Sequence, residues 1–134
     1  MLSSFSVRTR SKTSLVDVTR DVEEAVQELG IRDGAVLVFV PHTTAAVTIN
    51  ESADPDVARD IDAKLNELVP NSPAFRHAEG NSDAHVKSSM VGCSETVLVE
   101  GGRLILGTWQ GIFFCEFDGP RSRTVYVGEV GAAG

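Results

Sequence analysis

The sequence predicts a single α+β domain over residues 1–134, with largely antiparallel strands, and three observations lead to this fold class. The chain length of 134 residues suits one domain with one hydrophobic core. Two stretches repeat apolar residues at helical spacing, whereas the other apolar runs are short, rich in β-branched residues and bounded by turns. The last third of the chain looks entirely β. We therefore expect two main helices and about seven strands.

The first elements are expected to be strand and then helix. Residues 4–10 alternate apolar and polar positions as a half-buried strand does, and the alternation resumes near residues 14–16. Apolar residues then recur at helical spacing over residues 22–29, and Gly30 follows as a typical helix end.

A second strand and helix pair is expected in the middle of the chain. The run AVLVFV (35–40) is continuous and rich in valine, which is typical of a strand covered on both faces, and HTTAAVTI (42–49) continues as a further extended stretch. Asp54 followed by Pro55 is a strong helix start, because the carboxylate caps the helix and proline suits its first turn. This helix should end before Pro70.

The C-terminal part is expected to consist of a loop and then strands only. Residues 71–81 contain proline, glycine and small polar residues, which is typical of a loop that carries a site. Gly101 and Gly102 favour a two-residue hairpin turn with positive φ at both positions. The β-rich runs of this part are residues 96–100, 103–107, 109–117 and 123–130.

Composition limits the classes of partner and the location. Twelve Lys and Arg against nineteen Asp and Glu give a net charge of −7, which argues against a nucleic-acid partner. No apolar run reaches the length of a signal peptide core or a membrane span, so we expect a cytoplasmic protein without membrane contact. Cys93 and Cys115 are too few for a disulfide framework and are expected to be small buried hydrophobes, which agrees with this location.

The three histidines of the chain are the first candidates for chemistry. His42, His77 and His85 all lie in polar segments or next to predicted loops. A lone histidine is more often a surface or hydrogen-bonded structural residue, but three placed in this way favour a ligand set. Neutral imidazole is a common zinc ligand, and three such ligands leave a position for water or substrate. The spacing matches no short metal motif, so metal binding and structural roles both stay open.

Several other residues could hold an anion or a heterocycle. Lys87 and Ser88 follow His85 closely and could contact a phosphate oxygen, although a solvated turn with a surface lysine explains them equally well. Arg121 and Arg123 are alternate residues on one expected strand face and could form an anion clamp, or pair with surface acids. Trp109 could stack on a ligand, but core packing is the simpler role for the only tryptophan.

Three long motifs make the sequence resemble a known family. They are PHTTAAVTINESADPDV (41–57), HAEGNSDAHVKSSMVG (77–92) and LILGTWQGIFFCEFDGPRSRTVYV (104–127). Together they closely resemble the YjbQ family, also called UPF0047 or the secondary thiamine-phosphate synthase family. The resemblance implies a YjbQ-like two-sheet β-sandwich that assembles as a homotrimer, with a pocket near a subunit boundary.

The resemblance also implies which residues form that pocket. His42 matches the histidine of the family's PHTTA-like segment, and its HxEGNxxAHxK-like segment is matched by His77, Glu79, Asn81, His85 and Lys87. From the residues and the resemblance together we expect metal ligands at His42, His77 and His85, catalytic roles for Glu79 and Lys87, and ligand contacts from Asn81, Ser88, Trp109, Arg121 and Arg123.

The function expected from this resemblance is that of a metal-dependent enzyme acting on a phosphorylated small molecule. Its reaction would be thiamine-phosphate synthesis, a transferase reaction that joins an aminopyrimidine methyl diphosphate to a thiazole phosphate. A divalent metal ion, of the zinc or magnesium and manganese class, would neutralise the leaving diphosphate together with Lys87, Arg121 and Arg123. Two alternatives are a non-catalytic trimeric binding protein for a phosphorylated metabolite or metal, and a metal-dependent hydrolase assisted by Glu79.

Overall fold

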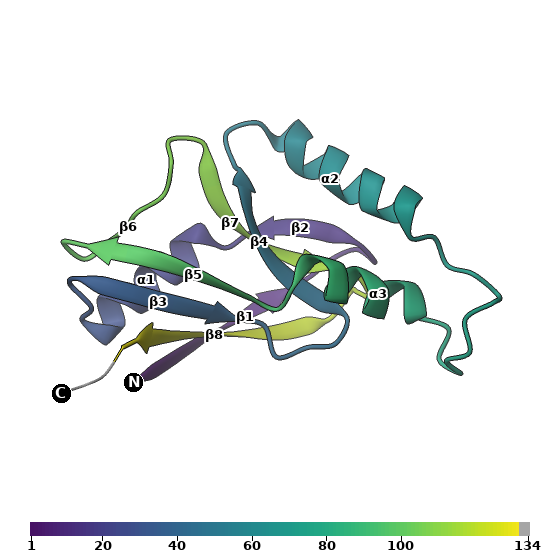
Figure 1. Ribbon diagram of the computed structural model, residues 1–134, viewed down its shortest axis with the longest axis horizontal. Helices are drawn as coiled ribbons and strands as arrows, with labels where there is room; N and C mark the ends of the chain where they lie inside the picture. Colours follow the sequence, from purple (N-terminus) through teal and green to yellow (C-terminus); the bar gives the residue numbers. More distant parts are fainter. Residues whose placement is uncertain (132–134) are drawn as a thin grey trace.

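Eight strands and three helices form residues 1–131, the part of the chain that the computed structural model describes (Figure 1). The last three residues of the predicted domain, 132–134, lie outside this part. In chain order the elements are β1 (Leu2–Arg8), β2 (Ser14–Asp17), α1 (Thr19–Leu29), β3 (Gly34–Phe39), β4 (Ala45–Glu51), α2 (Pro55–Leu68), α3 (Ser82–Val91), β5 (Ser94–Glu100), β6 (Arg103–Leu104), β7 (Gln110–Glu116) and β8 (Ser122–Val130).

The strands form two antiparallel sheets that share one core, so the predicted α+β sandwich is confirmed. One sheet has five strands in the order β1-β8-β3-β5-β6, and the other has three in the order β2-β7-β4. Val38 of β3 faces Val127 of β8 in the larger sheet, and Val47 of β4 faces Phe114 of β7 in the smaller one. These four side chains belong to one buried cluster that joins the two sheets.

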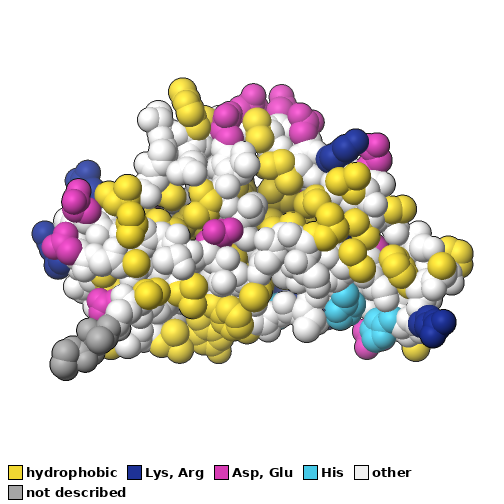
Figure 2. Space-filling model, viewed as in Figure 1, with side chains coloured by type: hydrophobic (Ala, Val, Ile, Leu, Met, Phe, Trp, Pro, Cys, Tyr) yellow, Lys and Arg dark blue, Asp and Glu magenta, His cyan; other side chains and the backbone are white. Residues whose placement is uncertain are grey.

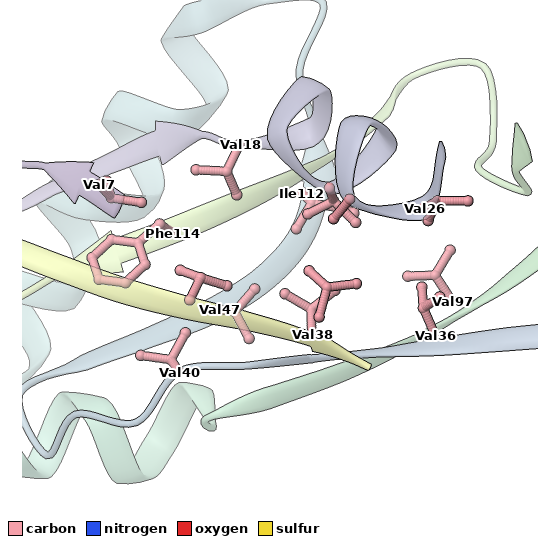
Figure 3. Packing of buried hydrophobic residues seen from close by; sticks show 14 of the residues in the cluster. Val7, Val18, Val26, Val36, Val38, Val40, Val47, Val97, Ile112 and Phe114 are labelled. Atoms are coloured by element: carbon pink, nitrogen blue, oxygen red, sulfur yellow. The ribbon is translucent and has the colours of Figure 1, made fainter. Parts of the chain in front are cut away.

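The core is built mainly from valine, with Ile112 and Phe114 from the smaller sheet (Figure 3). Helix α1 adds Val22, Ala25 and Val26, which recur on one face of the helix and are buried. Full burial of one such valine, isoleucine or phenylalanine contributes about 1.5–3 kcal/mol relative to leaving it exposed. This shared core fixes the two sheets relative to each other.

Strand β3 is covered on one face only, so the prediction of cover on both faces is wrong for a single chain. Val36 and Val38 point into the core and are fully buried. Leu37 and Phe39 alternate with them, as successive strand residues must, and remain 37% and 38% exposed. The outer face of the larger sheet is therefore apolar and open in the single chain.

The sequence predicted helix α2 but not helix α3. Helix α2 begins as predicted: Asp54 Oδ1 accepts a hydrogen bond of 2.9 Å from the Asp56 backbone N–H, and Pro55 occupies the first turn. Helix α3 was not predicted, because its buried residues are mostly polar and no apolar stripe marks its inner face. Both helices pack against the smaller sheet.

Three smaller predictions can be compared with the structure. Gly101 and Gly102 have φ of +59° and +78°, which confirms the predicted turn with positive φ at both positions. Cys115 is buried as expected, but Cys93 is exposed, because it follows Gly92 at the end of α3, where the chain turns into β5. Among residues 1–131, no helix is both long and apolar enough to cross a membrane.

Candidate functional site

A polar cleft of about 410 Å³ gathers most of the residues that the sequence singled out. It lies where the β3–β4 loop, the segment before α3 and the β7–β8 turn meet, and Figure 2 shows histidine side chains at the surface in this region. We call it the histidine cleft, and its lining residues are Pro41, His42, Thr43, Thr44, His77, Glu79, Asn81, His85, Arg121 and Arg123.

His42 is the best-fixed imidazole of the histidine cleft. Its Nε2 accepts a hydrogen bond of 3.0 Å from the Thr124 backbone N–H at the start of β8. Burial, and then the positive charge of Arg123, lower the pKa of His42. In the neutral ring an accepting Nε2 places the proton on Nδ1, so His42 offers an N–H donor from its other nitrogen.

The other two imidazoles are in contact with each other. The His77 and His85 rings pack edge to face, with centroids 5.3 Å apart and an interplanar angle of 88°. Glu79 Oε1 lies 3.9 Å from His77 Nε2, and both of these side chains are largely exposed. Glu79 is thus at the cleft, as predicted, but it contacts His77 only at long range.

Arg123 is already used inside the chain. Its Nε donates to Glu116 Oε1 at 2.9 Å, and its Nη2 bonds to Glu116 Oε2 and to Thr44 Oγ1, the latter at 2.9 Å. Burial raises the pKa of Glu116, but hydrogen bonds from Arg123 and Thr9 outweigh it and hold the pKa below its usual range. The predicted ligand contact of Arg123 is therefore limited, because Nε and Nη2 are committed to this buried pair.

Arg121 and Asn81 meet at a second acid. Asp118 Oδ2 accepts hydrogen bonds from Arg121 Nη2 at 2.7 Å and from Asn81 Nδ2 at 2.8 Å. Arg121 lies in the turn before β8, so it does not share a strand face with Arg123 as predicted, although both arginines line the histidine cleft. Burial raises the pKa of Asp118, but the Asn81 and Arg121 hydrogen bonds outweigh it and lower the pKa.

Lys87 and Ser88 do not belong to the histidine cleft. Residues two apart on a helix are rotated by about 200°, so α3 turns Lys87 away from the side that carries His85. Lys87 Nζ bonds to Asn66 Oδ1 and lines a different cleft, whereas Ser88 Oγ donates to the Ala45 carbonyl at 2.7 Å. The prediction of one phosphate-binding group around His85 is wrong, because short spacing in sequence does not mean a shared face.

Trp109 lies at the other end of the smaller sheet. The Trp109 carbonyl accepts a hydrogen bond of 2.8 Å from the Ser52 backbone N–H, just beyond the Glu51–Gln110 pair. The histidine cleft adjoins the opposite end of these strands, about 20 Å away for strands of this length. Trp109 is 63% exposed, so neither the ligand contact in this cleft nor the core packing expected from the sequence is realised.

The predicted metal site is not preformed in the described residues. Within residues 1–131, no group of three or more His, Cys, Asp or Glu side chains is placed to hold a metal ion. The geometry gives the reason: His42 Nε2 already accepts the Thr124 N–H, and His77 and His85 meet edge to face.

The sequence did not single out Glu116, Thr44 or Asp118, which hold the two arginines. Glu116 follows the apolar run IFFC and is itself fully buried. A single acid inside such a run is the signal that could have been used, because a buried carboxylate requires a partner.

The chain is similar to known proteins over nearly its whole length. The sequence model of the family described as "UPF0047 protein YjbQ-like" matches residues 3–132. The UPF0047 protein YugU of Bacillus subtilis is 54% identical over 132 residues, which is 98% of this chain and all of that protein. The UPF0047 protein MJ1081 of Methanocaldococcus jannaschii is 51% identical over 98% of this chain and 95% of its own length.

Solved structures agree in fold. The crystal structure of an uncharacterized conserved protein of the YjbQ/UPF0047 family from Clostridium acetobutylicum has a TM-score of 0.92 and 49% identity, covering 96% of this chain and 99% of that one. A hypothetical protein, APE1520 of Aeropyrum pernix, also has a TM-score of 0.92, with 42% identity over 98% and 99% of the two chains.

These findings correct the predicted function. The names of the relatives given above state no thiamine-phosphate synthase activity and no metal dependence, and the described residues contain no cluster suited to a metal ion. The prediction of a metal-dependent enzyme with thiamine-phosphate synthesis as its reaction is therefore wrong, and the metal-dependent hydrolase falls with it. Enzymatic activity as such, and a divalent metal as cofactor, stay untested predictions.

Proposed function

The chain belongs to the UPF0047 YjbQ-like family, and from the geometry of its histidine cleft we propose that it binds the phosphate group of a small molecule there, without a resident metal. The observation that carries this proposal is the convergence of three imidazoles and two guanidinium groups on one polar cleft. Imidazole N–H groups and arginine are the side-chain donors that suit a phosphate oxygen.

Local charge supports an anion in a chain that is acidic as a whole. The lining residues include two arginines and one carboxylate, Glu79, whereas the chain carries a net charge of −7. Glu116 and Asp118 stand behind the arginines and hold them in place. Because these donors are held in place before the ligand binds, less conformational entropy is lost on binding.

Titration with inorganic phosphate tests this proposal. We expect saturable changes in the His77 and His85 imidazole resonances, and affinity at least tenfold weaker in a His77→Gln, His85→Gln double variant. Lys64→Met is the matched control, because Lys64 is an exposed cation on α2 away from the cleft. Unchanged affinity in the double variant, or equal loss in the Lys64→Met control, would overturn the proposal.

We also propose that the protein is a homotrimer whose subunits cover the outer face of the larger sheet. Leu2, Leu37, Phe39 and Tyr126 line a shallow apolar depression of about 310 Å³ on this face. Figure 2 shows hydrophobic side chains gathered along its lower margin, where Figure 1 places β3 and β8. The sequence of β3 suits a strand covered on both faces, and a second copy would supply the missing cover.

Molar mass in solution tests this assembly. Light scattering should give three times the chain mass for the protein and a smaller species for a Leu37→Lys, Phe39→Lys double variant. Leu68→Lys is the control, because Leu68 is an exposed apolar residue on α2, outside the sheet face. A monomeric wild type, or a trimer that survives the double variant but not Leu68→Lys, would contradict the proposal.

A further inference from the structure

A second cleft, of about 240 Å³, lies on the other side of α3, between α2 and α3. We call it the α2–α3 cleft, and it is lined by Lys12, Thr13, Asn66, Val69, Pro70, Asn71, Asp83 and Lys87. It shares no lining residue with the histidine cleft. Its side chains therefore form a separate site, whose charges have to be explained separately.

Lys87 is a buried cation without a carboxylate partner. Only 1% of the residue is exposed, and its Nζ bonds to the neutral Asn66 Oδ1 and lies 5.6 Å from the Phe117 ring centroid. Over residues 1–131, no carboxylate oxygen comes within 4.0 Å of this ammonium group. A buried charge in this state is costly unless something else pairs with it.

Asp83 is a buried anion in the same condition. It is 4% exposed and lies four residues before Lys87 on α3, so the two side chains share one helix face. Its Oδ1 atom is buried and has no hydrogen-bond partner. Asp83 and Lys87 thus attract each other within one cleft, but they form no salt bridge.

Hydrogen bonds among neighbouring residues fix Asn66, whose side chain contacts Lys87. Asn66 donates from Nδ2 to Thr13 Oγ1 at 3.0 Å, and Thr13 donates to Asp62 Oδ2 at 3.2 Å. This chain of hydrogen bonds fixes the amide that Lys87 contacts. Lys12 adds an exposed positive charge at the rim of the cleft.

The unpaired charges define the ligand. A buried carboxylate calls for a cationic donor, and a buried ammonium calls for an anion, so a singly charged ligand would leave one of them alone. We propose that the α2–α3 cleft binds a small zwitterion of the α-amino acid class, whose ammonium group pairs with Asp83 and whose carboxylate pairs with Lys87. The cleft volume limits the ligand to a small side chain. This inference is independent of phosphate binding in the histidine cleft.

Three probes of similar size test the charge requirement. L-Alanine carries both charges, L-alaninamide only the ammonium, and propionate only the carboxylate. We expect saturable shifts of the Asp83 and Lys87 amide resonances with L-alanine, and at least tenfold weaker binding of the other two. Equal binding of the three probes, or no saturable shift with L-alanine because the cleft holds only water, would overturn the proposal.

Variants locate the binding and keep the test valid if one of them fails to fold. Asp83→Asn should weaken L-alanine binding at least tenfold, and Lys12→Met, at the exposed rim, should weaken it less. The His77→Gln, His85→Gln double variant should bind L-alanine as the wild type does. L-Alanine binding that survives Asp83→Asn in a folded protein, or that is lost in the histidine double variant, would contradict the assignment.

Discussion

The two clefts on either side of α3 both contain buried charge, and they differ in whether that charge is paired within the chain. Behind the histidine cleft, Glu116 and Arg123 satisfy each other, with further hydrogen bonds to Glu116 from Thr9 and to Thr44 from Arg123. In the α2–α3 cleft, Asp83 and Lys87 face the same space without pairing. Breaking a buried pair that is completed inside the chain is costly, and the charges left without such a pair are the basis of the ligand site proposed for the α2–α3 cleft.

The largest effect is expected at the completed pair. Glu116→Gln removes the charge that Arg123 requires in a fully buried position, and should lower the free energy of unfolding by about 3 kcal/mol. Urea denaturation measures this loss. Asp56→Asn breaks the exposed pair with Arg59 and is the control, with an expected change within about 0.5 kcal/mol.

Replacing Asp83 in the α2–α3 cleft by asparagine should lower the free energy of unfolding far less than Glu116→Gln does. Asp83 accepts no hydrogen bond at its buried Oδ1 and forms no salt bridge with Lys87, so Asp83→Asn removes only a longer-range attraction and should change the free energy of unfolding by less than about 1 kcal/mol. Urea denaturation without added ligand measures the difference. A loss of unfolding free energy as large as that of Glu116→Gln would contradict the proposed difference between the two clefts.

The smallest effect is a pH dependence of stability that arises from His42 in the histidine cleft. The pKa of His42 in the folded protein lies below the 6.5 of the unfolded chain, because of burial and the charge of Arg123. Its contribution to stability is therefore present above about pH 6.5 and is lost as the pH falls through the lower, folded-state pKa. His42→Gln should flatten the stability curve in this window, and NMR titration of His42 should show a midpoint below 6.5.

Much of the fold could be predicted because its signals are local. Asp54 and Pro55 mark the start of α2, and Gly101 and Gly102 fix the hairpin turn by their positive φ. Helix α3 was missed because it buries polar residues such as Asp83, so its inner face carries no hydrophobic period. Helix α3, which separates the two clefts, was thus the hardest element to predict from the sequence.

Part of the site could be predicted from residue type, whereas proximity in sequence was misleading. His42, His77 and His85 do line one cleft, although they are up to 43 positions apart in the chain. Lys87 was placed with His85 because two positions separate them, but a helix directs such residues to different sides. The role of Glu116 depends on a partner seven residues away, across a turn, which spacing alone does not indicate.

One measurement tests the separation of the two clefts most directly: a titration of a single labelled sample with inorganic phosphate and L-alanine, added in either order. The account predicts that phosphate shifts the His77 and His85 resonances, that L-alanine shifts those of Asp83 and Lys87, and that neither ligand changes the affinity of the other. Competition between the two ligands, or shifts of both sets of resonances by either one, would contradict it.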